Sequence, residues 1–326
     1  MTAQLRLVPS YVRSIIETSA NTPEFTSFLL ELLAQPGRAL AGQTAAWPRL
    51  VFETARALGG DPEAALVAAA AVDLAASAID VVDELIDDDW QGTPANRVRA
   101  QNAALALSFA AQSCVTNLVP IVGAERAARI GQLLAHGSSA CCDGQDLDLR
   151  LESTSDVTED LAHDMTARKS GSLVAMACRV GAAVATSDPR VIDAAGAFGT
   201  QFGLVAQLRN DLAGVSTDPA RRKGDLRRHK KTLPVAFALR CAAEDGDDQV
   251  SAWYAPSARH TAEQEQALAL RFLELGAHQF TWAVADVHRR TAHAALATLA
   301  ELSGRTEVTR LKRLMPSLGQ RELRAA

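Results

Sequence analysis

An acidic run over residues 83–89 holds the first side chains whose spacing suits chemistry. If the run lies on a helix, Asp83 and Asp87 share one face because they are four residues apart. Two carboxylates aimed at one point repel each other unless a hard cation lies between them, and Mg²⁺ is bound by carboxylates together with substrate phosphates. A solvated helix end is the alternative, but the preceding helix is apolar on nearly every face, and unpaired buried carboxylates are costly. The run therefore predicts Asp83 and Asp87 as Mg²⁺ ligands.

A second polar group lies at residues 207–218 and includes Gln207, Asn210 and Asp211. By itself an Asn-Asp pair is as often a helix cap or a turn. Here it follows another apolar stretch of helical spacing, which contains Phe202. The context favours a second metal-binding group.

Basic residues form the third group. Lys169 follows Arg168, and a cluster of cations precedes residue 232: Lys223, Arg227, Arg228, Lys230 and Lys231. A run of charges is usually a solvated face. Close to two acidic groups, however, such cations are suited to bind diphosphate oxygens through charge-assisted hydrogen bonds.

The elements that must position these side chains are helices. Apolar residues recur at helical spacing almost throughout, alanine is frequent, and no sustained alternation of β-branched and aromatic residues marks a strand. Short breakers separate about ten helical segments, and they lie at residues 36–37, 59–62, 92–94, 187–189 and 303–304. No long Pro/Gly/Ser linker divides the chain. We therefore expect one all-α domain over residues 1–326.

Composition argues against several classes of protein. The 326 residues carry a net charge of −5 with scattered Lys and Arg, which is not typical of nucleic-acid binding. The most apolar stretch, residues 64–82, contains Asp73 and Asp80, which a membrane span would not normally carry at its centre. The start has no apolar run of signal-peptide length, and five cysteines without Cys-x-x-Cys favour reduced thiols. We expect a cytoplasmic protein without a membrane span.

Taken in order, these pieces resemble the trans-prenyl diphosphate synthases and class I terpene synthases, over residues 36–240. Asp83 and Asp87 match the first and last acids of that superfamily's Asp-Asp-x-x-Asp motif, with Glu84 in place of the second. Residues 144–148 resemble its Gly-Gln-x-Leu-Asp segment, Lys169 its Lys-Thr-x-x-Leu, and residues 225–234 its Asp-x₄-Lys-x-Thr-Leu-Pro. The resemblance implies a single-domain helical bundle of the isoprenoid synthase type with a central active-site cavity, a Mg²⁺ cofactor, an allylic prenyl diphosphate as substrate and a homodimer.

The main departures concern the site for a second diphosphate. Elongating synthases hold isopentenyl diphosphate through Lys and Arg in Gly-Lys-x-x-Arg-Pro, whereas this chain has Gly37-Arg38 and lacks the second cation. The two arginines that follow the first motif in the family are Trp90 and Gln91 here, and the histidine before that motif is Val82. The resemblance therefore implies a retained ionising site and a dismantled isopentenyl site.

The second motif also differs, because it has Gly214 where the prenyl synthases have their final acid. Asn210, Gly214 and Asp218 instead fall at the spacing of the terpene synthase motif Asn-Asp-x-x-Ser/Thr-x-x-x-Glu. By that resemblance Asn210 and Asp218 bind Mg²⁺. Since Asp218 replaces a Glu and precedes a proline, Asp225 is the alternative last ligand.

We therefore predict a Mg²⁺-dependent class I terpene synthase that ionises farnesyl or geranylgeranyl diphosphate, cyclises the cation and releases diphosphate. The metals and the cations would neutralise the leaving diphosphate, and the small Ala75 and Ala78 would leave room for a long chain. The predicted catalytic residues are Asp83, Asp87, Asn210 and Asp211, and the predicted metal ligands are Asp83, Asp87, Asn210 and Asp218. The predicted substrate-binding residues are Lys169, Gln207, Arg209, Lys230, Ala78 and Phe202.

Three alternatives stay open. The first is a prenyltransferase that acts on a peptide, indole or sugar, because the altered motifs suit it equally. The second is a chain-elongating synthase with unusual cations. The third, from a different class, is a non-catalytic partner subunit, which would neither bind Mg²⁺ nor release diphosphate.

Overall fold

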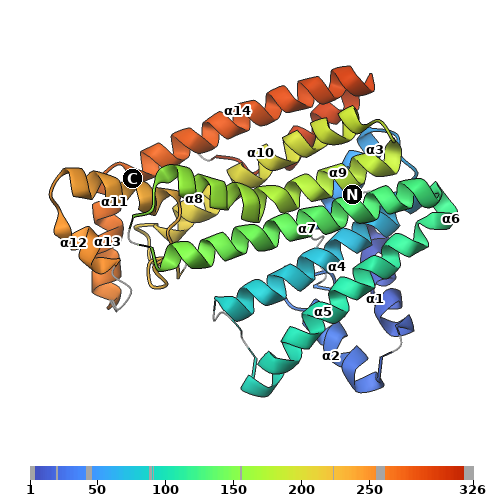
Figure 1. The fold of residues 1–326 in the computed structure, drawn as a ribbon, viewed down its shortest axis with the longest axis horizontal. Coiled ribbons are helices and arrows are strands. Elements are labelled where there is room, and N and C mark those ends of the chain that lie inside the picture. The colour runs from blue at the N-terminus through green and yellow to red at the C-terminus, as the bar shows by residue number, and fades with distance from the viewer. Residues whose placement is uncertain are drawn as a thin grey trace. The chain divides into compact units, whose positions relative to one another are not determined.

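A computed structural model of the chain describes residues 4–19, 21–41, 46–87, 90, 92–154, 156–222, 224–254 and 261–318 (Figure 1). Across these ranges the chain forms α-helices, two 3₁₀-helices and one π-helical turn, and no strand. The all-α prediction is confirmed. Asp88 and Asp89, which end the acidic run 83–89, lie outside the described residues, as do Gln91 and Lys223.

The predicted breakers lie between helices. Residues 58–61 separate α3 (Ala46–Ala57) from α4 (Pro62–Ile86), and residues 186–188 separate α9 (Ser172–Ala185) from α10 (Pro189–Gly214). The side chain of Asp61 caps α4 by accepting hydrogen bonds from the backbone N–H groups of residues 63 and 64. Proline at the first position of α4 also favours this start, because its missing N–H is not needed there.

The chain divides into two compact units. The first comprises Met1–Ser139, Leu173–Gly199 and Ala294–Leu314, and the second comprises Ala140–Ser172, Thr200–His293 and Met315–Ala326. Three of the boundaries fall inside long helices, namely α7 (Ala124–Glu152), α10 and α14 (Ala277–Ser303). The expectation of one domain over residues 1–326 stays a prediction.

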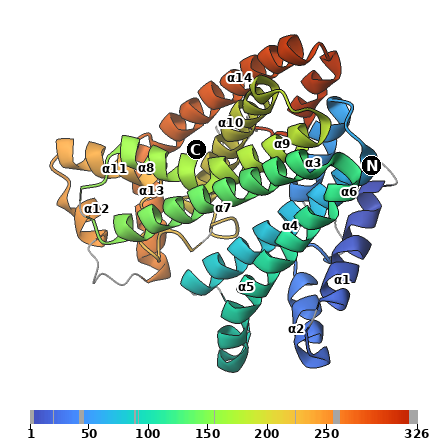
Figure 2. The ribbon, with the colours of Figure 1, turned by 45° about the vertical axis from the view of Figure 1, so that its right-hand side comes forward.

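The first unit is built around α4. Nearly every residue of this helix from Ala64 to Ala78 is buried, as its apolar composition predicts. It packs against α1, α3 and α5, and Figures 1 and 2 both show α4 and α5 side by side. Besides α3, α4, α9 and its parts of α7, α10 and α14, the unit contains η1 (Gln4–Leu7), α1 (Val8–Thr18), α2 (Pro23–Leu33), α5 (Pro94–Asn117), α6 (Val119–Val122) and η3 (Thr306–Leu314).

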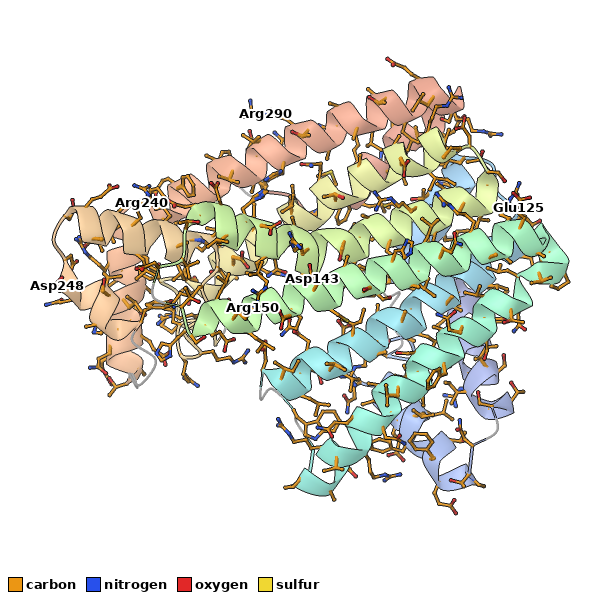
Figure 3. All side chains as sticks on the ribbon, in the orientation of Figure 1. Glu125, Asp143, Arg150, Arg240, Asp248 and Arg290 are labelled. Carbon is orange, nitrogen blue, oxygen red and sulfur yellow. The ribbon has the colours of Figure 1, made fainter. Side chains whose placement is uncertain are left out.

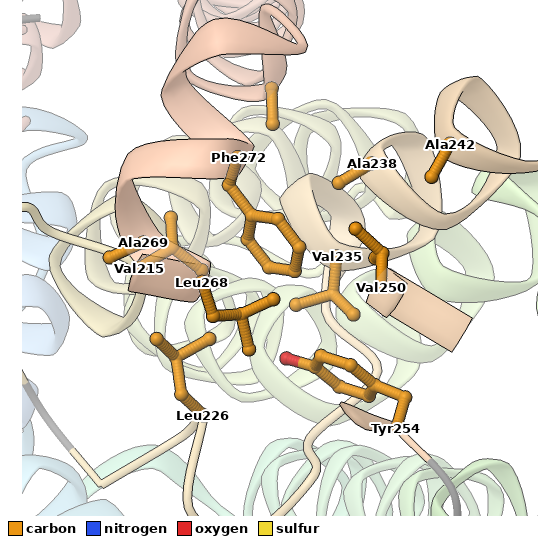
Figure 4. Close-up of a cluster of buried hydrophobic side chains, with 11 residues drawn as sticks. Val215, Leu226, Val235, Ala238, Ala242, Val250, Tyr254, Leu268, Ala269 and Phe272 are labelled. Carbon is orange, nitrogen blue, oxygen red and sulfur yellow. The ribbon is translucent and has the colours of Figure 1, made fainter. Parts of the chain in front are cut away.

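Two apolar clusters lie among the described residues of the second unit. The unit's own helices are α8 (Glu159–Thr166), the π-helical turn η2 (Ala167–Gly171), α11 (Leu233–Glu244), α12 (Asp248–Trp253) and α13 (Ala262–Glu274). One of the clusters joins the segment just after α10 to α11, α12, α13 and the start of α14 through buried side chains that include Val215, Leu226 and Phe272 (Figure 4). The other includes Leu208, Leu233 and Ala285.

Charged residues lie mainly on the outside of these helices. The six labelled in Figure 3 are all exposed, and they come from α7, α11, α12 and α14: Glu125, Asp143, Arg150, Arg240, Asp248 and Arg290. By length and composition alone, α4 and the stretch Pro94–Val122 are apolar enough to cross a membrane. In α4, 78% of the most apolar stretch is buried, against 33% in Pro94–Val122. The absence of a membrane span therefore stays a prediction, which rests on the acids inside α4.

Candidate active site

The first acidic group lies at the C-terminal end of α4. Asp83 is in the last turn of the helix, and Asp87 is its C-cap residue, whose backbone N–H donates to the Asp83 carbonyl oxygen (2.8 Å). Both residues are partly exposed, in contrast to the buried turns that precede them. The structure therefore places Asp83 and Asp87 one turn apart at the end of α4, and their role as metal ligands stays a prediction.

The second acid of this motif has a separate partner. Glu84 forms an ion pair of 2.6 Å with the guanidinium of Arg38, whose side chain is only 2% exposed. Arg38 also donates to the carbonyl oxygen of Leu32 and the side chain of Gln35. Arg38, the one cation that the sequence keeps where the family motif for isopentenyl diphosphate was expected, is thus buried and paired with Glu84.

Lys169 lies in the π-helical turn η2, which packs closely between two helices. A Cβ added to Gly144 of α7 would lie 2.2 Å from the Lys169 backbone nitrogen, and one added to Gly203 of α10 would lie 2.8 Å from Gly171. Both helices can approach the turn only because these positions are glycine. Single π-helical turns are frequent at functional sites, and here the turn presents Lys169 to α7.

Two lysines share one buried carboxylate. Lys169 Nζ lies 3.0 Å and Lys230 Nζ 3.1 Å from Asp148 Oδ2, and Lys230 also pairs with Glu152 at 2.7 Å. Burial alone would raise the pKa of Asp148, but the two ammonium groups outweigh it and hold that pKa below its ordinary value. His229, just before Lys230, has φ 55°, a left-handed conformation uncommon for a residue other than glycine.

Asp211 is the buried acid of the second motif. Its Oδ1 accepts a hydrogen bond from Gln207 (2.8 Å), and Gln207 Oε1 accepts one from the Ser170 hydroxyl (2.9 Å). Its Oδ2 is buried and has no hydrogen-bond partner among the described residues. Burial raises the pKa of Asp211 to about 8, although the Gln207 hydrogen bond lowers it.

Asp225 lies where the missing acid of the second motif would be. A Cβ built on Gly214 would lie 2.0 Å from Asp225 Oδ2, so the carboxylate fills the space of a side chain at position 214. The neighbours Val215 and Leu226 are both fully buried in the cluster of Figure 4, which holds the two segments together. Asp225 also contributes to the raised pKa of Asp211, after burial.

The sequence pattern of the polyprenyl synthetase family matches residues 32–271. The chain is 33% identical over 240 residues to "Geranylgeranyl diphosphate synthase" of Mycobacterium tuberculosis, which covers 70% of this chain and 68% of that protein. The chain belongs to the polyprenyl synthetase family. Its fold agrees with a polyprenyl synthetase from Streptomyces coelicolor A3(2), with a TM-score of 0.78, 24% identity and coverage of 95% and 97%.

A second solved fold of this polyprenyl synthetase type is the geranylgeranyl pyrophosphate synthase from Corynebacterium glutamicum, complexed with isoprenyl diphosphate and magnesium. Its TM-score is 0.72 at 20% identity, with coverage of 94% of this chain and 98% of that one. The fold predicted from the sequence resemblance is therefore confirmed.

The other predicted residues of this polyprenyl synthetase differ in burial. Ala78 and Phe202 are buried, whereas Arg209 and Asn210 are exposed. Asp218 is exposed as well: its Oδ1 accepts a hydrogen bond from the Ala220 backbone N–H, and its Oδ2 lies 3.4 Å from Arg221. Asp218 therefore stabilises the turn after α10, which is what an Asp just before a proline commonly does.

The carboxylates of the candidate site suit a hard cation that also receives oxygen ligands from the substrate. Within the described ranges, no three His, Cys, Asp or Glu side chains form a group that could hold a metal by itself. Mg²⁺ does not need one, since it is usually bound by one or two carboxylates together with phosphate oxygens and water. The unmatched buried oxygen of Asp211, beside Asp225, is the feature that fits best.

Sequence reasoning missed the roles of Asp148 and of the Arg38–Glu84 pair. The signal for Asp148 was present, because it ends the Gly144–Asp148 segment that resembles the family motif. Nothing in the spacing indicated that one carboxylate anchors lysines 21 and 82 residues further along the chain.

Proposed function

We propose that this chain is a Mg²⁺-dependent prenyl diphosphate synthase, which ionises an allylic prenyl diphosphate and joins the cation to isopentenyl diphosphate. The observation that carries the proposal is the 33% identity to a geranylgeranyl diphosphate synthase over most of the chain. Retention of the ionising residues Asp83, Asp87 and Asp211 supports it. Similarity to synthases with this activity is stronger evidence than the motif differences from which we predicted a terpene cyclase.

The lysines supply charge for the leaving diphosphate. Lys169 and Lys230 are fixed by Asp148 before any substrate arrives, and donors that are preorganised need no rearrangement as charge develops. Gln207 orients the Asp211 carboxylate through its hydrogen bond. Bound Mg²⁺ would supply Lewis-acid polarisation of the diphosphate oxygens.

We propose two groups of Mg²⁺ ligands. Asp83 and Asp87 form the first group, and Asp211 and Asp225 form the second. The carboxylate over Gly214 supports Asp225 in the place that we had given to Asp218. Asn210 keeps its proposed role as a neutral oxygen donor beside Asp211.

Cyclisation of the allylic cation is the second candidate. The ion pair between Arg38 and Glu84 favours it, because a buried and paired guanidinium is poorly placed to receive a second diphosphate. Without isopentenyl diphosphate, the cation would react within its own chain. Transfer of the prenyl group to an acceptor of another chemical class is also consistent with the ion pair between Arg38 and Glu84.

We also propose that the protein is a homodimer that associates through α5. Val98, Leu105 and Phe109 of this helix are 67%, 60% and 69% exposed, and Val119, just beyond it, is 42% exposed. Val98, Leu105 and Phe109 recur at spacings of seven and four residues, which places these three along one stripe of α5. Exposed apolar stripes of this kind mark protein interfaces.

The test is incubation of the pure protein with Mg²⁺ and ten-, fifteen- or twenty-carbon allylic diphosphates, each with and without isopentenyl diphosphate. Released diphosphate and extracted products are followed together, with Asp83→Ala as the control. A longer linear diphosphate that needs isopentenyl diphosphate supports the synthase. A cyclic hydrocarbon or alcohol from one substrate alone contradicts it and establishes the cyclase.

A further inference from the structure

The chain between α10 and α11, which we call the α10–α11 segment, carries two residues of the proposed site. Between Gly214 and Leu233 its described residues form turns and no helix. Asp225 lies in it against Gly214, and Lys230 in it pairs with Asp148. A segment without helical hydrogen bonds keeps one conformation only where neighbouring elements hold it. The contacts of the segment with those elements therefore decide where Asp225 and Lys230 lie.

The end of the segment is held by α7. Lys231, which is 2% exposed, donates from Nζ to the carbonyl oxygens of Leu151 (3.3 Å) and Thr154. The last carbonyl groups of a helix have no partner within it, and a lysine there supplies one. Lys231 thus fixes the end of the segment beside the carboxylate that Lys230 contacts.

The start of the segment is held by Gln266 of α13. Its Nε2 donates to the carbonyl oxygen of Thr217 (3.0 Å), and its Oε1 accepts from the guanidinium of Arg222. The Nε of Arg222 in turn donates to the carbonyl oxygen of Ser216 (2.9 Å). Burial lowers the pKa of Arg222, so this guanidinium is partly withdrawn from water and depends on its acceptors. Both groups of one amide side chain therefore close the turn over residues 216–222.

The middle of the segment is held by Glu265, also of α13. Arg227 Nε lies 2.9 Å from Glu265 Oε1, and its Nη2 lies 3.5 Å from Oε2. Glu265 is 8% exposed, and a buried carboxylate without a cation would be costly. Leu226, which lies between Asp225 and Arg227 in the chain, belongs to the same buried cluster as Leu268 of α13 (Figure 4). One face of α13 thus contacts the segment next to Asp225.

We propose that Glu265 and Gln266 are positioning residues, which hold the α10–α11 segment in the conformation that binds Mg²⁺ and diphosphate through Asp225 and Lys230. The inference rests on the roles that the proposed function gives to Asp225 and Lys230. It adds a helix that supplies no metal ligand and no cation for the diphosphate.

The expected effect follows from the population of the binding conformation. When only a fraction of the molecules holds the segment in that conformation, the apparent dissociation constant rises by the inverse of this fraction. Saturating Mg²⁺ and substrate draw the segment back into place, so the rate at saturation is kept. Loss of a contact with α13 should therefore raise half-saturating concentrations and leave kcat nearly unchanged.

The experiment compares wild type with Glu265→Gln and Gln266→Met in the full chain. Glu274→Gln is the matched control, because it also removes a carboxylate from an arginine pair of α13, but its partner Arg271 lies in the same helix (3.3 Å). Diphosphate release is titrated with Mg²⁺, using isopentenyl diphosphate and whichever of the ten-, fifteen- or twenty-carbon allylic diphosphates wild type converts. Amide hydrogen exchange of residues 215–232 is measured without substrate, and thermal unfolding verifies that the variants fold.

We expect both variants to need about tenfold more Mg²⁺ for half-maximal release, with kcat within about twofold of wild type. Exchange over residues 215–232 should be at least about fivefold faster than in wild type and in Glu274→Gln. An unchanged Mg²⁺ requirement in both variants would overturn the inference alone. A lower kcat at an unchanged Mg²⁺ requirement would also overturn it, since a merely structural role has that effect. No diphosphate release by wild type from any of the three substrates would overturn the proposed function, and this inference with it.

Discussion

Gly214 and Asp225 show how one residue can take over the position of another. The second motif has no final acid in sequence, yet the Asp225 carboxylate lies against the Cα of Gly214. This exchange needs a residue without Cβ at 214, because any side chain there would occupy the same space. The glycine is therefore a positioning residue for the proposed metal group.

Gly214→Ala should accordingly displace the Asp225 carboxylate. We expect a higher Mg²⁺ concentration for half-maximal diphosphate release, by about tenfold, with destabilisation of about 1–3 kcal/mol from overpacking. Titration of activity with Mg²⁺ measures the first effect and urea unfolding the second. Gly171→Ala is the control, because its added Cβ would have no neighbour closer than 3.5 Å. An unchanged Mg²⁺ requirement would remove Asp225 from the metal group.

Asp148→Asn tests the shared anchor of the two lysines. We expect the free energy of unfolding to fall by about 3 kcal/mol at pH 7, because Lys230 is buried and loses a charged partner. The folded-state pKa of Asp148 is lowered, so its contribution is present above the ordinary value of 3.8 and is lost as the pH falls further. Urea unfolding of both proteins at pH 7 and pH 3 should therefore show a smaller difference at pH 3. An equal difference in unfolding free energy at pH 7 and pH 3 would mean that the ion pairs contribute little to stability.

At the scale of helices, α4 and α5 differ although both are long and apolar. α4 is buried and carries its acids at one end and along one stripe. α5 packs against α4 on one side and keeps an apolar stripe exposed on the other. Such a stripe costs free energy in water, since each apolar side chain left exposed forgoes its burial.

Association through α5 predicts that a charge in this stripe produces monomers. We expect Leu105→Lys to raise the dimer dissociation constant by at least about 100-fold, because an unpaired charge would be buried at the interface. Sedimentation velocity over a concentration series measures it. Val287→Lys is the matched control, since Val287 is 53% exposed on α14. A wild-type protein that sediments as a monomer would contradict the proposed homodimer.

At the scale of the whole molecule, buried acids make stability depend on pH. In the folded state the pKa of Asp73 is raised by burial and then by Asp80, and the pKa of Asp80 is raised to about 6, mainly by burial. A raised folded-state pKa means that stability is full below the unfolded value and is lost as the pH rises through the folded value. The fold should therefore be more stable at pH 5 than at pH 8.

Asp73→Leu should remove part of this dependence. Between 3.8 and about 7, at roughly 1.4 kcal/mol per pKa unit, ionisation of Asp73 costs the folded state about 4 kcal/mol. We expect the variant to exceed wild type in unfolding free energy at pH 8 and to exceed it by much less at pH 4. Urea unfolding without Mg²⁺ at the two pH values measures this. A variant that is less stable than wild type at pH 8 would show that Asp73 has a stabilising partner.

The sequence by itself determined the helices, the family and the two acidic groups. Helical periodicity, the Asp61-Pro62 start of α4 and the spacing of Asp83 and Asp87 are local features, and local spacing survives in any tertiary arrangement. The order of the motifs was equally readable. The preference for a cyclase was less well supported, because missing cations indicate what a site lacks and not which reaction its relatives perform.

Only the tertiary structure decided which side chains meet. The pairing of Arg38 with Glu84, of Lys169 and Lys230 with Asp148, and of Asp225 with Gly214 joins segments that are eleven to 82 residues apart. Such contacts depend on how helices pack against one another, which no spacing along one helix encodes. Burial of Asp73 without a hydrogen-bond partner among the described residues is likewise a property of the packed core, since on the sequence alone it is one acid within an apolar helix.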